Sequence, residues 1–266
     1  MMLTKEQLKQ SVDQYGDSSK LVNRLGITEE DVTETVVLAP WWHPNKLYNN
    51  YDCKIELLSD EFPDVHRITF NNKSFLHIRS YVGATNVGET VLLLSFTRCK
   101  RIIFVGSVGS ISNDVNIGDL VIPSISVSGE AFSSYMYETI NKESLHKEYH
   151  PTKELYDATT NYLKNKTIDY KDIKVYSVDT IAGQFAHIDE ILNLGCKAIE
   201  METSALFSAC QVAEKECVAL LDVSDNTILN KSLISGRTDE DMEKYHKTRY
   251  EVIPKIILKL VEAQNE

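Results

Sequence analysis

The sequence predicts an α/β fold in which one mixed, twisted central β-sheet is flanked by helices. Short apolar runs typical of buried strands alternate with segments typical of helices along most of the 266 residues. A hairpin pattern in the first half adds antiparallel strands. Because no linker rich in Pro, Gly or Ser divides the chain, we expect a single domain at 1–266, with an N-terminal helical extension at 1–33 and a closing C-terminal helix at 239–266.

The first fifty residues predict two helices, a strand and a loop. A surface helix is expected at 4–15 and a second, shorter one near 21–25, after which a glycine stop precedes a new cap and turn. The apolar residues 36–39 predict a short buried strand. The crowded segment 40–46 contains two prolines, which exclude a helix or a central strand, so we expect a loop there.

A hairpin and a helix are expected next. Residues 66–70 and 75–79 read as strands on either side of an Asn-Asn pair, which favours a tight turn between antiparallel strands. The apolar segment 87–99 then predicts a helix, and either Thr85 or Asn86 is positioned to cap its first turn.

A strand predicted at 101–105 ends in the glycine-rich sequence G-S-V-G-S at 106–110. This sequence matches neither a P-loop nor the dinucleotide-binding fingerprint. It is either a tight turn, or part of a polar pocket lined by backbone N–H groups and the Ser107 hydroxyl. The other elements expected downstream are a strand at 120–127, helices at 151–166 and 189–194, a strand at 173–178, a loop at 224–238 and one or two helices at 239–263.

The stretch 197–227 organises the prediction of function. It contains Glu200 and Glu202, then a helix with small residues on one side, then an apolar strand at 217–223 that leads into Asp225. Acids at strand ends are costly unless they meet a ligand or a partner, and ligands of open α/β sheets lie at strand ends. The alternatives are solvated strand-edge carboxylates for the two glutamates and a helix cap or Asx turn for the aspartate.

The composition excludes several classes of function. A net charge of -11 argues against a nucleic-acid or anionic-membrane surface. No apolar run approaches the ~20 residues that a membrane helix needs, and the polar N-terminus does not resemble a signal peptide. The five cysteines are scattered and odd in number, which fits reduced core residues in a cytoplasm. No C-x-x-C pair occurs and the seven histidines show no ligand spacing, so no metal site is expected.

Four aromatic side chains each have two interpretations. His43 and His187 are acid/base groups or lie on the surface of loops, and without a visible partner the surface is the commoner outcome. Trp41 and Trp42 stack on a base or cover the core, and core packing is the commoner outcome for adjacent aromatics.

A set of motifs carries a family resemblance. Its members are L-G-I-T at 25–28, V-G-S-V-G at 105–109, I-G-D-L-V-I-P at 117–123, a G-Q pair at 183–184 after Asp179, I-E-M-E-T-S-A at 199–205 and V-S-D at 223–225. Over about 25–227, these motifs resemble the nucleoside phosphorylase/nucleosidase superfamily, in the branch of uridine phosphorylase and hexameric purine nucleoside phosphorylase.

The resemblance implies a mixed sheet with the active site at its loop end, and transfer of a ribosyl group from the base of a nucleoside to phosphate or water. It also implies a homo-oligomer, a dimer or a trimer of dimers, in which sites are completed across the dimer interface. Inorganic phosphate is a co-substrate in such enzymes, and no other cofactor is implied. The expected partner is a small-molecule nucleoside, not a nucleic acid or a membrane.

The resemblance also implies roles for individual residues. Glu202, helped by Glu200 and Met201, would bind the ribose and favour the cationic sugar ring that forms as the bond opens. Asp225 would be the general acid that protonates a purine ring nitrogen of the leaving base. The base would also contact two residues of the preceding loop, Ile181 and Gln184.

The chain departs from the family where phosphate binds. The loop motif G-D-P-x-R is replaced by W-H-P-N-K at 42–46, and Glu61 and Phe104 stand where the family has arginines. Each lost arginine fork removes charge-assisted bonds of about 1.5–3 kcal/mol. The remaining candidates for the phosphate or water site are Lys46, Ser107, Gly106, Thr85 and, as a base near water, His43.

Three alternatives for function therefore stay open. Phosphorolysis fits the family, hydrolysis fits the missing arginines, and a non-catalytic nucleoside sensor fits a pocket that has lost turnover. The presence of both Glu202 and Asp225 argues against the sensor, because a binder does not need a general acid. Asp225 favours a purine-type base, and the arginine that accompanies the G-Q pair in uridine phosphorylases is absent.

Overall fold

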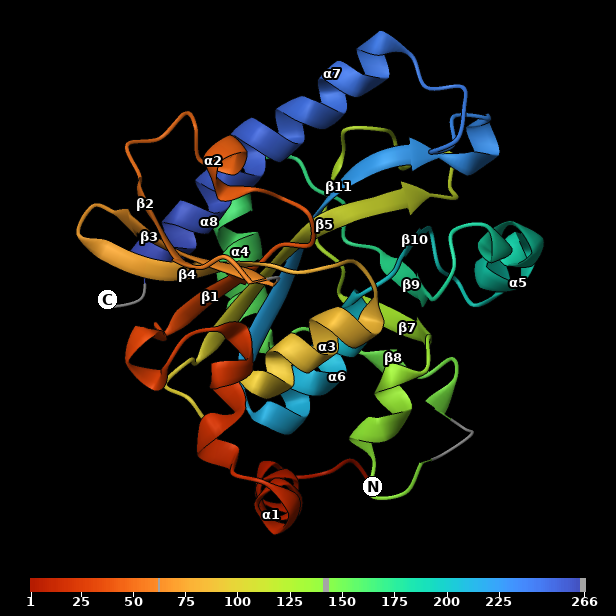
Figure 1. The fold of residues 1–266 in the computed structure, drawn as a ribbon. Coiled ribbons are helices and arrows are strands. Elements are labelled where there is room, and N and C mark those ends of the chain that lie inside the picture. The colour runs from red at the N-terminus through yellow and green to blue at the C-terminus, as the bar shows by residue number, and fades with distance from the viewer. Residues whose placement is uncertain (62, 141–143, 264–266) are drawn as a thin grey trace.

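Helices cover both faces of one mixed β-sheet in the computed structural model of the chain, which describes residues 1–61, 63–140 and 144–263 (Figure 1). The α/β class predicted from the sequence is confirmed. The strands are β1 (Thr35–Leu38), β2 (Lys54–Ser59), β3 (Asp64–Phe70), β4 (Lys73–Arg79), β5 (Arg101–Ser110), β6 (Leu120–Val121), β7 (Ile125–Gly129), β8 (Glu148–Tyr149), β9 (Lys174–Val178), β10 (Ala198–Glu200) and β11 (Glu216–Asn226).

The helical elements fall between and after these strands. The α-helices are α1 (Lys5–Tyr15), α2 (Pro44–Leu47), α3 (Ala84–Leu93), α4 (Lys153–Asn165), α5 (Ile188–Asn193), α6 (Thr203–Ala213), α7 (Asp239–Lys247) and α8 (Ile253–Glu262). Short 3-10 helices occur at Ser18–Leu25, Glu29–Asp31, Phe132–Met136, Gly183–His187 and Thr227–Leu229. A π-helical turn, Thr248–Val252, joins α7 to α8. Among the described residues, no helix is both long and apolar enough to cross a membrane.

The sheet has a branched order around β5. The path is β2-β3-β4-β1-β5-β10-β9-β7-β8, and β11 pairs with β5 and β6. β5 runs parallel to β1 and β11, whereas β10 pairs with its last residues in the antiparallel sense. The long strands β5 and β11 are buried on both faces, as parallel strands between helix layers usually are. Their last residues lie side by side, because Asp225 pairs with Gly109 and Asn226 with Ser110.

Alternation along β1 shows how the two cores form. Val36 and Leu38 point into the core beneath α3 and α6, whereas Val37 and Ala39 point into the core beneath α4 and α8. Figure 1 shows these two helix layers on opposite sides of the sheet. All four residues are fully buried. Burial on both faces explains why this short apolar run is a strand inside the sheet and not at its edge.

Local signals in the sequence predict several elements correctly. Thr4 caps α1 through a capping box, in which its side chain accepts a hydrogen bond from Gln7 N at 3.1 Å. The β3–β4 hairpin turns at Asn71 and Asn72, whose φ angles of 47° and 61° suit a tight turn with two left-handed residues. The closing segment forms α7 and α8, and its last three residues, 264–266, lie outside the described part.

The segment predicted as a loop at 40–46 contains the start of a helix, which corrects the prediction. Pro44 is the first residue of α2, a position where the missing N–H is not needed and the fixed φ angle suits a helix. His43 caps it, because its Nδ1 accepts a hydrogen bond from Asn45 N at 3.2 Å. Strand β2 was not expected at all.

The helix predicted at 87–99 begins earlier and ends earlier. It runs over α3, and its cap residue is Gly83, which has a φ angle of 100° and makes no side-chain cap bond. Thr85 and Asn86 therefore lie inside the first turn, and neither caps it. A glycine is suited to this left-handed backbone position because it has no side chain.

Three strand boundaries also differ from the prediction. The glycine-rich segment 106–110 is not a turn, because it pairs with β11 as the second half of β5. The strand expected at 120–127 is divided into β6 and β7 around Pro123, which has no N–H for a sheet ladder. β11 continues through Asp225 to Asn226, so the loop expected at 224–238 starts later.

Candidate active site

A cavity of about 280 Å³ opens beside the second half of β5, the end of β10 and the end of β11. Its walls come from the segment after β1, the second half of β5, the end of β10, the end of β11 and the α7–α8 region. The lining residues are Pro40, Trp41, Trp42, Val82, Gly106, Ser107, Gly109, Ile111, Ile181, Gln184, Ile199, Glu200, Met201, Glu202, Ser224, Asp225, Thr227, Leu233, Tyr245 and Arg249. The cavity thus combines apolar walls with a few acids and one arginine, the usual make-up of a small-molecule site.

Glu202 and Asp225 open onto this same cavity from different strands. Glu202 follows β10 at the start of α6, and Asp225 lies near the end of β11. Both residues are buried, with exposed fractions of 6% and 3%. Two buried carboxyl groups that face one cavity are expensive to bury, which indicates a ligand-binding role for the space between them.

Glu200 has a different role from the one expected for it. β10 ends at Glu200, so Glu200 and Glu202 do not belong to the same strand. Its carboxylate accepts hydrogen bonds from the backbone N–H groups of Glu202 and Thr203, both at 2.6 Å, and from the hydroxyls of Ser177 and Thr203. These bonds satisfy the free N–H groups at the start of α6. Glu200 therefore holds the α6 terminus, and its surface also borders the cavity.

Glu202 keeps capacity to accept further hydrogen bonds. Its Oε1 accepts a bond from Gly83 N at 2.6 Å, and its Oε2 accepts one from Met201 N at 3.2 Å. Burial and, to a smaller extent, the charge of the neighbouring Glu200 together raise the pKa of Glu202 to about 8. The ionised form, which accepts bonds from sugar hydroxyls, is thus stabilised only when donors arrive with a ligand.

Replacement of Glu202 by glutamine is expected to change how stability depends on pH. Because the folded pKa of about 8 exceeds the ordinary value of 4.5, the native state binds the extra proton between these pH values. The free energy of unfolding therefore falls as pH rises from 4.5 to 8, by up to about 1.4 kcal/mol per pH unit. Melting curves of both proteins at pH 5 and pH 8.5 should show the variant gaining several degrees relative to the wild type at the higher pH. A constant difference between the two melting temperatures would contradict the raised pKa.

Asp225 is aimed into the cavity by an irregularity in β11. The register between β5 and β11 shifts between Val223 and Asp225, so Ser224 is the extra residue of a β-bulge. Asp225 then pairs with Gly109 across the sheet, where a Cβ would lie only 3.0 Å from Asp225 Oδ1. The missing side chain of Gly109 is what allows the carboxyl group to occupy this position.

The protonation of Asp225 reflects opposing influences. Burial raises its pKa, while a 2.6 Å hydrogen bond from Ser224 Oγ and the charge of Arg237 lower it. Arg237 is held nearby by a 3.3 Å bond from its Nη1 to the Ser224 carbonyl oxygen. A carboxyl group with a raised pKa retains a proton at higher pH than usual, which suits a general acid.

Arg249 lines the cavity and was not predicted from the sequence as a site residue. Its guanidinium lies between two aromatic rings, 4.1 Å from the centre of Trp42 and 4.2 Å from that of Tyr245. Nη2 donates to Ser107 Oγ at 2.5 Å, and Nε donates to Asp222 Oδ2 at 3.0 Å. The sandwich fixes the plane of the guanidinium, and Nη2 is directed at Ser107 in the cavity wall.

Asp222 holds Arg249 in place through an ion pair. It is fully buried, and burial raises its pKa to about 6 against the opposing charge of Arg249. Its Oδ1 has no hydrogen-bond partner within the described structure, so Arg249 is its main compensation. The pairing of Asp222 with Arg249 could not be predicted from the sequence. The two residues are far apart in the chain, and an arginine in an amphipathic helix is usually solvated.

The structure separates the other predicted site residues into two groups. Ile181, Gln184, Met201, Gly106 and Ser107 line the cavity, as the predicted site requires. The second group is absent from the described lining: Thr85 and Lys46 are exposed on α3 and α2, and His43 faces away toward β3. Their predicted contacts with phosphate or water are therefore not supported by their positions.

The residues at the positions of the missing arginines are also placed outside the cavity. Phe104 is fully buried in the core, where its ring packs close to Gly106, and Glu61 is exposed. Of the aromatics with two interpretations, Trp42 is buried and faces Arg249, whereas Trp41 is exposed at the cavity mouth. His187 is exposed and pairs with Glu190 at 3.2 Å.

Comparison with known proteins places the chain in a family. A family model described as "Phosphorylase superfamily" matches residues 49–257. A DeoD-type purine nucleoside phosphorylase of Geobacillus stearothermophilus is 26% identical over 149 residues, which are 55% of this chain and 60% of the relative. A 5'-methylthioadenosine/S-adenosylhomocysteine nucleosidase of Staphylococcus haemolyticus is 22% identical over 209 residues, which are 72% of this chain and 87% of the relative.

Solved structures show the same fold. A uridine phosphorylase of Vibrio fischeri has a TM-score of 0.74 at 18% identity, over 90% of this chain and 96% of that one. A purine nucleoside phosphorylase of Toxoplasma gondii in complex with immucillin-H has a TM-score of 0.71 at 17% identity, over 89% and 94%. The matches to the first two curated relatives span 60% of the length of each.

Proposed function

Since the chain belongs to the phosphorylase superfamily, we propose that it cleaves the N-glycosidic bond of a nucleoside, with a purine nucleoside favoured, and transfers the ribosyl group to phosphate or water. The observation that carries this proposal is the convergence of Glu202 and Asp225 on one cavity. Breaking this bond creates positive charge on the sugar ring and negative charge on the leaving base. A site for the reaction needs a group for each charge.

Glu202 and Asp225 provide these groups. Glu202 accepts hydrogen bonds from the sugar hydroxyls, and its negative charge stabilises the cationic ring, against which Met201 packs. Asp225, with its raised pKa, donates a proton to a ring nitrogen of the purine as the bond opens. Gln184 and Ile181, on the opposite wall, contact the base. In this proposal Glu200 has no contact with the sugar, because it holds the start of α6.

The nucleophile is proposed to be phosphate. Arg249, Ser107 and the backbone of Gly106 lie on one wall of the cavity, and Arg249 presents its free donors there. An aromatic-clamped guanidinium is a suitable anion contact in place of the missing family arginines. Hydrolysis is the second candidate, because Arg249 is already paired with Asp222 and no second arginine lines the cavity in the described structure.

The setting of the enzyme is proposed from the same observations. All five cysteines lie in the described part and none is in a disulfide, which supports a reducing compartment such as the cytoplasm. Trp41, Tyr81 and Val82 are exposed around the cavity mouth, with exposed fractions of 56%, 49% and 42%. A homo-oligomer, either a dimer or a trimer of dimers, would cover this apolar rim and complete the site.

A panel of nucleosides incubated with and without inorganic phosphate tests the proposal. We expect release of free base from at least one purine nucleoside, accompanied by ribose 1-phosphate when phosphate is present. Release of free sugar at the same rate without phosphate identifies a hydrolase. Binding of nucleosides without any release contradicts the enzymatic proposal and supports a sensor.

A further inference from the structure

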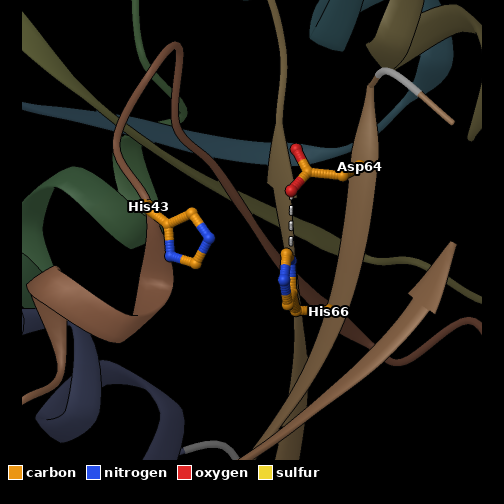
Figure 2. Close-up of side chains that lie close together, drawn as sticks. All are labelled: His43, Asp64 and His66. Atoms are coloured by element: carbon orange, nitrogen blue, oxygen red, sulfur yellow. Dashed lines mark ion pairs between the residues drawn. The ribbon is translucent and has the colours of Figure 1, made fainter. Parts of the chain in front are cut away.

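Three side chains outside the cavity gather into a group that the proposed reaction does not use. His43 precedes α2, and Asp64 and His66 point from β3 toward it, as Figure 2 shows. One potential ligand atom from each of the three lies within 4.8 Å of the other two. The rings of His43 and His66 meet edge to face, with centroids 5.5 Å apart. The 23-residue gap between the histidines is no recognised ligand spacing, so only the fold brings them together.

His66 shows that this group is incomplete as a protein-only arrangement. Its side chain is 7% exposed, and its Nδ1 has no hydrogen-bond partner among the described residues. Asp64 Oδ2 lies 3.8 Å from it, which is too long for a hydrogen bond (Figure 2). A buried imidazole nitrogen without a partner is uncommon, because its desolvation is uncompensated.

Arg79, which is not a member of the group, orients the carboxylate of Asp64. Its Oδ1 accepts a 2.7 Å bond from Arg79 Nε, which leaves Oδ2 directed at His66. A partner that fixes a carboxylate in this way is typical of the surroundings of metal ligands. The positive charge of Arg79 disfavours a nearby cation, so an ion has to gain enough from the two imidazoles and the carboxylate to offset that repulsion.

One lone pair of His43 is already in use. Neutral imidazole offers one lone pair, and in His43 the lone pair on Nδ1 now accepts the bond from Asn45 N. An ion bound to His43 takes the place of this cap bond.

We propose that His43, Asp64 and His66 bind a divalent transition-metal ion, with Zn²⁺ as the best match. Two imidazoles and a carboxylate suit Zn²⁺ and related metals, and do not suit Mg²⁺ or Ca²⁺, which select oxygen ligands. Around Zn²⁺ at ~2.0–2.2 Å the ligand atoms lie ~3.3 Å apart. Asp64 and His66, 3.8 Å apart, are near this spacing, and the ligand atom of His43, within 4.8 Å of both, has to come closer when an ion binds.

The ion would connect two segments of the chain next to the cavity and would not contact the substrate. It joins the segment before α2 to β3, and the neighbouring residue of His43 is Trp42, which stacks on Arg249. On the other side, His77 Nε2 contacts the Trp42 carbonyl oxygen at 2.8 Å. Metal binding is therefore expected to stabilise the fold and the placement of Trp42. The proposal does not depend on the proposed reaction, because it can be tested without a nucleoside.

Titration of the EDTA-treated full-length protein with Co²⁺ tests the site directly. We expect visible d–d absorption that saturates at one equivalent, is displaced by Zn²⁺, and is accompanied by a Zn²⁺-dependent rise in melting temperature. His43→Ala and His66→Gln should each weaken Co²⁺ binding at least tenfold. The matched control is His187→Ala, which removes an exposed histidine paired with Glu190 and should leave binding unchanged.

Two variants are used because weaker Co²⁺ binding in one of them could result from loss of folding. His43 is half-buried and its replacement removes only the cap bond from Asn45 N, so His43→Ala should fold in EDTA with a melting temperature a few degrees below the wild type. This variant decides the outcome if His66→Gln does not fold. Absence of Co²⁺ binding to the wild type overturns the proposal. Equal Co²⁺ affinity in wild type and His43→Ala overturns it as well, because the ion then lies elsewhere. Base release in the nucleoside panel is a separate measurement and does not bear on either result.

Discussion

Asp225→Asn is expected to slow base release by about 10²–10⁴-fold, while the affinity for nucleoside stays within a few-fold of wild type. Asparagine keeps the shape of the side chain and an oxygen that can accept the Ser224 hydroxyl bond. It has no proton to give to the leaving base. The turnover rate should be measured on the best substrate from the nucleoside panel, and the dissociation constant by calorimetry.

A neighbouring variant separates acid catalysis from local structure. Ser224→Ala removes the 2.6 Å bond to Asp225 but keeps the carboxyl group, so its rate should fall less than tenfold. That bond lowers the pKa of Asp225, so the alkaline limb of the pH–rate profile should move to higher pH in Ser224→Ala. A rate of Asp225→Asn equal to wild type would remove this residue from the mechanism.

Arg249→Met is expected to raise the KM for phosphate by about 10- to 100-fold, because a hydrogen bond to a charged group contributes about 1.5–3 kcal/mol. The same change leaves the Asp222 carboxylate buried without its partner, which costs about 3–5 kcal/mol of stability. Lower stability alone could thus reduce activity. The double variant Asp222→Asn with Arg249→Met removes both charges and should recover most of the melting temperature.

The phosphate dependence of the double variant is the decisive measurement. If Arg249 binds phosphate, the KM stays high although the protein is stable again. A normal KM in a stable double variant would assign Arg249 to the structure of the cavity wall alone. If the wild type proves to be a hydrolase, phosphate should affect neither protein, and Arg249 then has no anion to bind.

Sequence patterns were sufficient for the fold and for the two central acids. Strands β5 and β11 are apolar on both faces, which predicts strands buried between two layers, and their polar ends mark the edge where the cavity lies. The sequence alone shows that Asp225 follows an apolar run and that Glu202 precedes a helix. The family match and the shared fold agree with this part of the prediction.

Features that depend on distant contacts could not be predicted in the same way. Glu200 and Glu202 look equivalent in sequence, and their roles differ because β10 stops between them and α6 starts. Arg249 reaches Ser107 across 142 positions of the chain. The partners of His43 are set by how the segment after β1 crosses β3. No local spacing contains this information.

The π-helical turn between α7 and α8 has a consequence for relatives of this protein. Successive residues of an α-helix point about 100° apart, and a π-turn accommodates one additional residue. A homologue with an uninterrupted helix would therefore rotate everything on one side of the junction, and an arginine at the aligned position would point elsewhere. An arginine aligned with Arg249 therefore does not by itself show that a related enzyme has a guanidinium in its cavity wall. The path of the helix before that arginine must also be the same.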